Sequence, residues 1–237
     1  RMERSLVDAV ADVVRDGGRA VVVAGPFGRA QEMLLAIKSS MMSGQTPRYA
    51  VCAGPRVAAV CEALSGLLPD LAEPLRRYVE NSRQHVFWGD GTAASPAIQP
   101  WSGDTPRLWA RGAHACAVVA AVPGDGAPLT EFAEGVAHHE SSAVFIPTSG
   151  DEDALPDALR RALDDGWLPT PDGPLPLACR VVEYDVPMHA DQAQLCGLVK
   201  TIKPQAVVLT HGRPEAIQAV RQKLSGGMQV YTPMNGD

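Results

Sequence analysis

The stretch VPMHADQAQLCGLVKTIKPQAVVLTHG, residues 186–212, decides the fold predicted for this chain. Two apolar runs, each typical of a buried strand, lead directly to a histidine, His189 in the first run and His211 in the second. Between them, Asp191 predicts a helix N-cap, Gln194 occupies the capping-box position, and a proline stops the helix. The unit is therefore strand, histidine, helix, strand, histidine, and we expect both imidazoles at the same edge of one sheet.

Two histidines at neighbouring strand ends suit a metal-dependent hydrolase, in which one imidazole binds a metal ion and the other donates a proton. Gly212 follows His211 at the expected turn, where glycine can take a backbone conformation that other residues resist. An isolated histidine is more often structural, but the paired arrangement favours a site role for both. Asp191 is predicted to be a helix cap close to the site and not a ligand.

The same segment resembles the S-A-H-A-D-Q … K-P … V-x-L-V-H-G-E signature of the β-CASP proteins, which are nucleases with a metallo-β-lactamase fold. Residues 17–32, GGRAVVVAGPFGRAQE, are similar to the family's G-G-x-V-L-I-P-A-F-A-x-G-R-A-Q-E, and residues 230–237, VYTPMNGD, resemble its P-x-N-G-E. The three matches occur in family order and span nearly the whole chain. The resemblance implies an α/β fold, with a parallel-sheet β-CASP domain and the C-terminal half of a metallo-β-lactamase αββα fold.

The resemblance also implies roles for individual residues. His189 matches the residue that protonates or hydrogen-bonds the leaving oxygen, and His211 matches a zinc ligand. Family members carry serine at the position of Pro187 and glutamate at that of Arg213, so this chain adds a positive charge beside a cation site. The complete family fold binds two zinc ions and acts on nucleic acid phosphodiesters, and RNA is favoured over DNA as the substrate here.

The family's chief metal ligands lie on an H-x-H-x-D-H motif, which does not occur among the six histidines of this sequence. We therefore expect a chain that lacks the front half of the lactamase domain and is not an active hydrolase alone. Zinc should bind weakly or not at all, because a tight site needs three or four protein donors. A half-domain without its partner sheet should also expose an apolar face, which favours a homodimer or a partner chain carrying the missing half.

Gly28 and Arg29 open a predicted helix directly after a strand, where free backbone N–H groups favour an anion. They are candidates for a substrate phosphate contact in the cleft between the two domains. The alternative, which carries equal weight, is that Gly28 is a turn residue and that Arg29 pairs with Glu32 on one helix face. The tryptophans leave a similar choice between stacking bases and pinning an irregular stretch to the core; they are Trp88, Trp101, Trp109 and Trp167.

Elsewhere, apolar strands alternate with helices, which predicts a parallel sheet covered by helices on both faces. Residues 89–111 are rich in glycine and proline and are expected to be irregular. The Pro- and Gly-rich residues 168–176 are the best candidate for a domain boundary. The predicted β-CASP domain therefore comprises residues 1–167, and the predicted lactamase part comprises residues 168–237.

The composition is ordinary for a globular chain of 237 residues, with 46% hydrophobic and 20% charged residues. No apolar stretch reaches the roughly 18 residues of a membrane span. The five cysteines are scattered and never form C-x-x-C, which favours buried thiols in the reducing cytoplasm. The net charge of −6 argues against strong nucleic acid binding by this piece alone. Two alternatives therefore stay open: a non-catalytic scaffold or partner subunit, and a hydrolase of a small-molecule ester.

Overall fold

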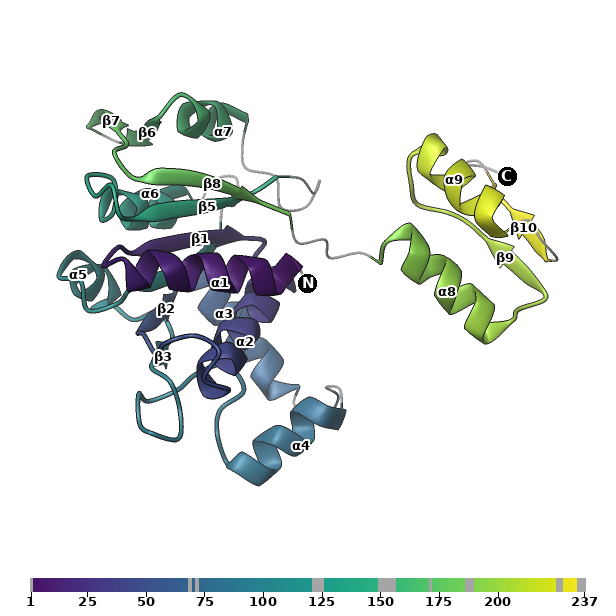
Figure 1. Ribbon diagram of the computed structural model, residues 1–237, viewed down its shortest axis with the longest axis horizontal. Helices are drawn as coiled ribbons and strands as arrows, with labels where there is room; N and C mark the ends of the chain where they lie inside the picture. Colours follow the sequence, from purple (N-terminus) through teal and green to yellow (C-terminus); the bar gives the residue numbers. More distant parts are fainter. Residues whose placement is uncertain are drawn as a thin grey trace. The chain divides into compact units, whose positions relative to one another are not determined.

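The computed structural model describes residues 2–67, 70, 73–120, 126–148, 157–170, 172–185, 190–224 and 228–233. Contacts within the chain divide it into two compact units (Figure 1), which we call unit 1 (Arg1–Val186) and unit 2 (Pro187–Asp237). Each unit contains strands and helices of its own, so each is described by itself.

Unit 1 is built on a six-stranded sheet in which every pair of neighbouring strands is parallel. From one edge to the other, the strands are β3 (Ile98–Gln99), β2 (Val51–Ala53), β4 (Cys116–Ala120), β1 (Ala20–Ala24), β5 (Ala143–Pro147) and β8 (Arg180–Tyr184). The parallel-sheet α/β fold expected from the sequence is thus confirmed.

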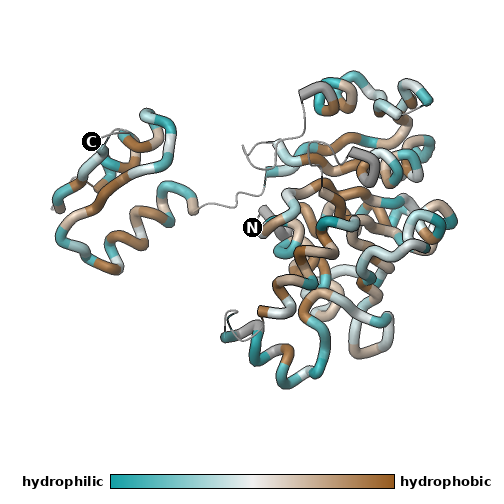
Figure 2. Tube along the Cα trace, turned by 180° about the vertical axis from the view of Figure 1, so that it is seen from behind, coloured by the Kyte–Doolittle hydropathy of each residue, from teal (hydrophilic) through white to brown (hydrophobic). Residues whose placement is uncertain are grey.

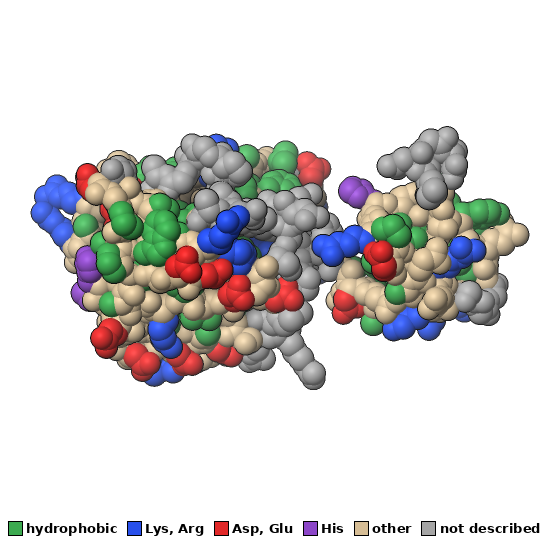
Figure 3. Space-filling model, turned by 90° about the horizontal axis from the view of Figure 1, so that it is seen from above, with side chains coloured by type: hydrophobic (Ala, Val, Ile, Leu, Met, Phe, Trp, Pro, Cys, Tyr) green, Lys and Arg blue, Asp and Glu red, His purple; other side chains and the backbone are tan. Residues whose placement is uncertain are grey.

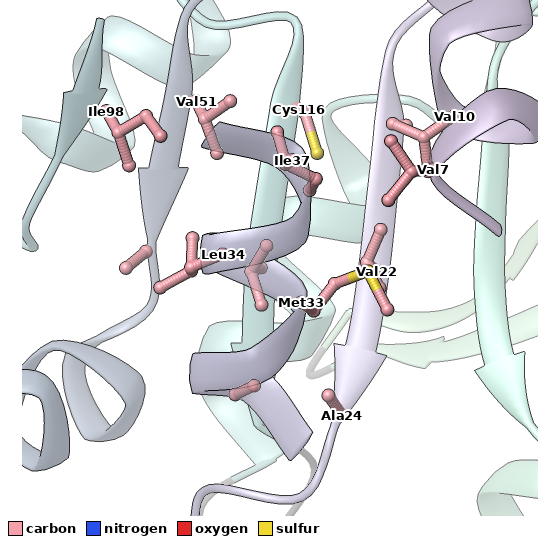
Figure 4. Packing of buried hydrophobic residues seen from close by; sticks show 14 of the residues in the cluster. Val7, Val10, Val22, Ala24, Met33, Leu34, Ile37, Val51, Ile98 and Cys116 are labelled. Carbon is pink, nitrogen blue, oxygen red and sulfur yellow. The ribbon is translucent and has the colours of Figure 1, made fainter. Parts of the chain in front are cut away.

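Helices cover both faces of this sheet. The helices described in unit 1 are α1 (Met2–Arg15), α2 (Arg29–Met42), α3 (Pro55–Gly66), α4 (Glu73–Ser82), α5 (Thr105–Ala110), α6 (Gly126–Glu134) and α7 (Asp157–Asp164). Val22 of β1 shares one core cluster with residues of α1 and α2 (Figure 4), whereas Val21 and Val23 share the opposite cluster with α6. All five residues of β1 are buried, which explains why its sequence is continuously apolar and not alternating. Figure 2 shows the same concentration of apolar residues in the interior of unit 1.

Trp101 and Trp109 hold the stretch before β4 against α6. The indole N–H of Trp109 donates to the carbonyl oxygen of Phe132 at 2.9 Å, and the two ring centroids lie 5.2 Å apart in an edge-on contact. Trp101 meets the same phenylalanine edge-on at 6.0 Å. For these two tryptophans, pinning to the core is confirmed.

Residues 89–111 are more regular than predicted. They contain β3, which pairs with β2 and is bridged on its other side by Gly89, and the short helix α5. The expectation of a wholly irregular stretch is therefore wrong. A two-residue strand is too short for any periodicity to show, because its pairing partners and not its own residues define it.

The described part of the Pro- and Gly-rich stretch, residues 168–170 and 172–176, is also regular. These residues fall in an antiparallel hairpin of β6 (Trp167–Thr170) and β7 (Gly173–Pro176) inside unit 1. Strand β8 then pairs with β5, so the contacts divide the chain after Val186 and not between residues 167 and 168. The assignment of residues 1–167 to a β-CASP domain and of residues 168–237 to a lactamase part stays a prediction.

Unit 2 contains α8 (Gln192–Ile202), β9 (Ala206–Val208), α9 (Pro214–Leu224) and β10 (Gln229–Tyr231), and its two strands are parallel. Several large apolar side chains of this unit are exposed, and we call them the exposed apolar set: Leu195, Leu198, Ile202, Val208 and Tyr231. Val208 and Tyr231 are partners across the two strands, so they lie on the same face of the small sheet. The expected exposure of apolar surface by this part of the chain is confirmed.

Within the described ranges, no helix combines the length and the apolar character needed to cross a membrane. All five cysteines are buried free thiols, as the sequence predicts. Burial raises the pKa of Cys52 to about 12 and that of Cys61 to about 11, so these thiols stay protonated and unreactive near neutral pH.

Candidate functional site

The topological switch point of unit 1 lies between β1 and β4. These strands are neighbours, yet the helices that follow them, α2 and α6, pack in the clusters on opposite faces of the sheet. Open parallel sheets bind ligands outside the carboxyl ends of the strands at such a point. The predicted substrate residues Gly28 and Arg29 follow β1 directly, so they lie at this edge.

The loop between β1 and α2 is held by the side chain of Gln31, which is only 4% exposed. Its amide oxygen accepts a hydrogen bond from the Gly28 N–H at 2.7 Å, and its amide nitrogen donates to the Pro26 carbonyl oxygen at 3.1 Å. Gly28 has a φ of 85°, a conformation that glycine adopts without steric cost. The turn alternative for Gly28 is therefore confirmed, and Gln31 is a positioning residue that the sequence reasoning missed.

The free N–H groups expected at the start of α2 are already used within the loop. The N–H of Arg29 donates to the Phe27 carbonyl at 3.2 Å, and the N–H of Ala30 donates to the Gly25 carbonyl at 3.2 Å. The expectation of free donors is therefore wrong for the N–H groups of Arg29 and Ala30, because the loop folds back on itself. The Arg29 side chain is 4% exposed. A substrate contact by Gly28 and Arg29 stays a prediction.

Phe27 is a second residue at this edge that the sequence reasoning missed. Its side chain is 69% exposed, although phenylalanine is normally buried. The loop on either side is fixed by the bonds of Gln31, so the exposed ring is carried on a rigid support. An aromatic residue between proline and glycine in a strand-to-helix turn is the signal that could have identified it.

His211 lies in the turn between β9 and α9 of unit 2, and it is exposed. The Leu209 N–H donates to the Tyr231 carbonyl at 2.8 Å, which extends the strand pairing almost to the histidine. His211 has a φ of 65°, in the left-handed region, where histidine is found more often than most other non-glycine residues. The turn therefore presents the imidazole to solvent from a constrained backbone position.

Two expectations about this turn are wrong. The unusual backbone conformation belongs to His211 and not to Gly212, whose φ is not positive. Gly212 instead lies close to α9, because a Cβ added there would be 3.3 Å from Cγ1 of Ile217. The apolar run before His211 is not a buried strand either, since Val208 of β9 is 60% exposed.

Asp191 begins α8 as the sequence predicts. Its carboxylate accepts a hydrogen bond from the Gln194 N–H at 2.8 Å, and its own N–H donates to the Gln194 side-chain oxygen at 2.9 Å. This reciprocal pair is a capping box, which satisfies two N–H groups at the helix start. The function of Asp191 as a cap accounts for both of its observed bonds, and its closeness to a site stays a prediction.

His189 lies outside the described residues, so its distance from His211 stays untested. The strand before it, β8, belongs to the six-stranded sheet of unit 1, whereas β9 belongs to the two-stranded sheet of unit 2. The expectation that the two strands share one sheet is therefore wrong. Pairing is a tertiary property, and the apolar runs alone did not distinguish one sheet from two.

The predicted zinc site needs more donors than the described residues supply. No three His, Cys, Asp or Glu side chains in that part of the chain are grouped so that they could hold a metal ion. Zinc generally takes three or four protein donors, so His211 by itself does not form a site. The residues that follow it, Gly212 and Arg213, add no donor, and the arginine adds a positive charge that repels a cation.

A known protein family matches the end of the chain. Residues 174–233 match the domain described as "RMMBL: Zn-dependent metallo-hydrolase RNA specificity domain". The matched range begins in the β6–β7 hairpin and includes both predicted histidines, His189 and His211.

Curated proteins are similar over nearly the whole chain. RNase aCSPSF2 of Saccharolobus solfataricus is 25% identical over 242 residues, which cover 99% of this chain and 44% of that protein. Transcription termination factor FttA of Methanocaldococcus jannaschii is 23% identical over 258 residues, covering 99% and 38%. Cleavage and polyadenylation specificity factor subunit 3-I of Arabidopsis thaliana is 23% identical over 247 residues, covering 98% and 33%.

The parallel-sheet α/β fold, the matched domain and these relatives together indicate the class of protein. They support a relationship to the β-CASP family of metallo-β-lactamase-fold proteins. The chain spans between 33% and 44% of the length of the three relatives, so their whole-protein activities do not transfer to it directly.

Proposed function

We propose that this chain acts in the metal-dependent hydrolysis of RNA phosphodiesters and that His211 is one ligand of the metal ion. The observation that carries the proposal is the placement of His211, exposed and in a left-handed backbone conformation between β9 and α9. Such strained backbone positions in non-glycine residues are concentrated at functional sites. The residue also falls within the stretch that matches a Zn-dependent metallo-hydrolase domain.

RNA is the favoured substrate because charge is divided unevenly along the chain. Residues 187–237 carry five Lys and Arg against three Asp and Glu, whereas residues 1–186 carry sixteen against twenty-four. Unit 2 is therefore basic within an acidic chain, and the face seen in Figure 3 shows basic side chains at several points on it. Contacts between cationic side chains and phosphates supply most of the non-specific affinity for nucleic acid. The relatives named as an RNase and as a cleavage factor support the same choice.

In this proposal, His189 hydrogen-bonds or protonates the leaving oxygen, as a general acid does. Gly28 and Arg29 contact a phosphate of the substrate, and the exposed Phe27 ring beside them offers a surface for a base. Asp191 does not act on substrate; its capping box fixes the start of α8 shortly after His189. Zinc, when bound with further donors, would supply Lewis-acid activation of water.

A second candidate function is a non-catalytic RNA-binding partner of an active relative. Arg213 supports it, because a guanidinium two positions after His211 weakens the attraction of the turn for a cation. Both candidates place RNA on unit 2, and they differ in whether His211 has a role in turnover. A hydrolase of a small-molecule ester is less favoured, because it gives no reason for the basic charge of residues 187–237.

The experiment that tests the proposal measures RNA binding and cleavage separately. A fluorescent single-stranded RNA is titrated with this chain, and cleavage is measured with zinc in the protein as its gene encodes it. His211→Asn should lower cleavage at least about tenfold and leave RNA affinity within about twofold, since loss of a metal ligand acts on the chemical step. Equal cleavage by both proteins would remove His211 from the site. Binding without any cleavage would favour the partner function.

For the chain by itself we expect zinc to bind weakly or not at all, because the described donors are too few. Metal analysis after chelator treatment and dialysis against zinc checks this, and a stoichiometric metal that depends on His211 would contradict it. The proposal also includes a cytoplasmic location, where buried free thiols stay reduced, and association of unit 2 with a second copy or a partner chain.

A further inference from the structure

A hollow of about 480 Å³ opens beside β3, at the edge of the unit 1 sheet. Its lining includes Arg83, His85, Trp88, Asp90 and Ser95. Strand β3 is separated from β1 by β2 and β4, so the hollow is distinct from the loop that carries Gly28. Ligand sites commonly occupy about 300–1,000 Å³, so this space can take a group the size of a nucleobase.

The wall of the hollow carries a stacked pair of rings. His85 lies over Trp88 with ring centroids 5.8 Å apart and planes inclined by 18°. His85 is exposed, whereas Trp88 is half-buried beneath it, so the stack has an open outer side. Aromatic platforms of this kind bind unstacked bases of any sequence, because every base has a π face.

The histidine ring is fixed in position before any ligand arrives. Nδ1 of His85 accepts hydrogen bonds from the N–H groups of Phe87 and Trp88, both at 3.2 Å. Since Nδ1 is an acceptor, the neutral ring carries its proton on Nε2, which can donate to a ligand. A pre-set ring loses little conformational entropy on binding.

Two further side chains support the platform from below. The ammonium of Lys38, which is 2% exposed, donates to the carbonyl oxygens of His85 at 2.6 Å, Val86 at 3.2 Å and Trp88 at 2.9 Å. The Trp88 indole N–H donates to Glu62 at 2.5 Å. The segment that carries the rings is therefore tied to α2 and α3.

The hollow also holds polar groups suited to the edge of a base. Ser95 is 5% exposed, and within the described part of the chain its hydroxyl has no hydrogen-bond partner. Arg83 and Asp90 carry opposite charges, so the lining is close to neutral and suits a base better than a phosphate.

We propose that this hollow binds one unstacked base of a single-stranded RNA, with the base lying on the outer face of His85. The inference rests on the proposed function for the choice of RNA, and it adds a contact on unit 1 to those proposed for Gly28 and unit 2. An RNA strand bound here would be held by stacking and not by charge. This is compatible with the net negative charge of residues 1–186, which does not attract phosphates.

The test uses a fluorescein-labelled single-stranded RNA of twelve adenylates and measures its affinity for the intact chain. His85→Ala should weaken binding about 5- to 10-fold, at the lower end of what one base stack contributes. His85→Phe keeps a flat ring and should recover most of the affinity. His138→Ala removes another exposed histidine from the same unit and should leave binding unchanged. Circular dichroism spectra of the variants verify that each is folded.

A second measurement locates the base. The Cε1 proton of His85 is followed by NMR during titration with the same RNA and with adenosine 5′-monophosphate, and ring stacking should shift it upfield with the RNA. If the RNA binds equally to wild type and His85→Ala, the inference is wrong while RNA binding by the chain stands. A shift with the mononucleotide alone overturns RNA as the ligand of this hollow. If RNA does not bind the chain at all, the proposed function fails together with the inference.

Discussion

The side-chain oxygen of Gln31 accepts a hydrogen bond from the Gly28 N–H at 2.7 Å, and this bond closes the loop between β1 and α2. A glutamine in the first turn of a helix is usually solvated, but this one is 4% exposed. It therefore shapes the carboxyl edge of the sheet at the switch point, where the family motif G-R-A-Q-E lies. The motif glutamine has a structural reason to be there that is separate from any contact with substrate.

Gln31→Ala is expected to lower the free energy of unfolding by about 1–3 kcal/mol, because it leaves half-buried polar groups of Gly28 and Pro26 without these partners. Urea unfolding measures the loss, and amide exchange at Gly28 should become faster. Gln45→Ala changes an exposed glutamine just beyond α2 and serves as the control. Identical unfolding midpoints for Gln31→Ala and the wild type would show that the loop does not depend on this side chain.

Lys38 should make stability depend on pH in the alkaline range. Burial lowers the pKa of Lys38 in the folded chain to about 8, whereas a lysine in the unfolded chain has a pKa of about 10.4. Between these values the unfolded chain holds a proton that the folded chain has released, so the free energy of unfolding rises with pH. At pH 7 the protonated amine still donates to the three carbonyls beneath the His85 platform.

Lys38→Met is expected to lower the free energy of unfolding at pH 7 by about 1–3 kcal/mol, since the carbonyls of His85, Val86 and Trp88 lose a charged donor. The difference from wild type should then grow between pH 8 and pH 10, which urea unfolding at four pH values can follow. Lys200→Met, on the exposed surface of α8, is the matched control. A constant difference across that range would contradict the lowered pKa.

His85 should resist protonation in the folded chain. Burial is the main cause that lowers the pKa of His85 below the ordinary histidine value. The negative charge of Glu62 raises the pKa and the positive charge of Lys38 lowers it, so these two effects oppose each other. Protonation would also remove the acceptor that holds the N–H groups of Phe87 and Trp88. The unfolded chain binds this proton first as pH falls through about 6.5, so the contribution of His85 to stability decreases there. NMR titration of its Cε1 proton checks the direction against a histidine peptide, and a midpoint above that of the peptide would refute it.

Long apolar runs were the part of the fold that the sequence made predictable. Strand β5 (Ala143–Pro147) is a continuous apolar run and α9 (Pro214–Leu224) begins at a proline, so local signals of the sequence define both elements. Strand β3 carries no such signal in its two residues, since its partners lie on β2 and at Gly89. Hydrogen bonding between distant segments determined that element.

The candidate site was predictable in the same uneven way. The Asp191 cap follows from a local sequence rule, and the structure has it. The left-handed backbone was expected at Gly212 but belongs to His211, whereas Gly212 lies close to Ile217 of α9. Glycine adopts the left-handed conformation more readily than histidine does, so residue preference alone predicted Gly212 instead of His211. The buried side chains of Gln31 and Lys38 hold neighbouring loops by hydrogen bonds, and no local sequence pattern predicted that these polar residues would be buried.

Self-association should depend on the exposed apolar set of unit 2. Leu198 and Ile202 are 57% and 64% exposed on α8, and such surface tends to be covered by another chain. We expect light scattering of the wild type to show dimers or larger species, and the Leu198→Ser, Ile202→Ser double variant to shift the population towards monomer. Leu67→Ser removes an exposed leucine from unit 1 and should leave the distribution unchanged. A wild type that is monomeric at high concentration would rule out this role for the set.

His211 allows the backbone and the imidazole to be tested separately. Its φ of 65° costs an ordinary L-residue roughly 1–2 kcal/mol, whereas glycine has no such cost. His211→Gly should therefore leave unit 2 at least nearly as stable as the wild type, and His211→Val should destabilise it by about 1–2 kcal/mol. Amide exchange at Leu209, whose N–H bonds to the Tyr231 carbonyl, reports on unit 2 alone.

His211→Asn completes this series, because asparagine tolerates the left-handed conformation but lacks the imidazole. If His211 is a metal ligand, this variant should fold like the wild type and still lose metal-dependent cleavage of RNA in the protein as its gene encodes it. A purely structural histidine would give the opposite pattern, with Leu209 exchange accelerated and cleavage unchanged per folded molecule. The two measurements thus separate a residue retained for its backbone conformation from one retained for its chemistry.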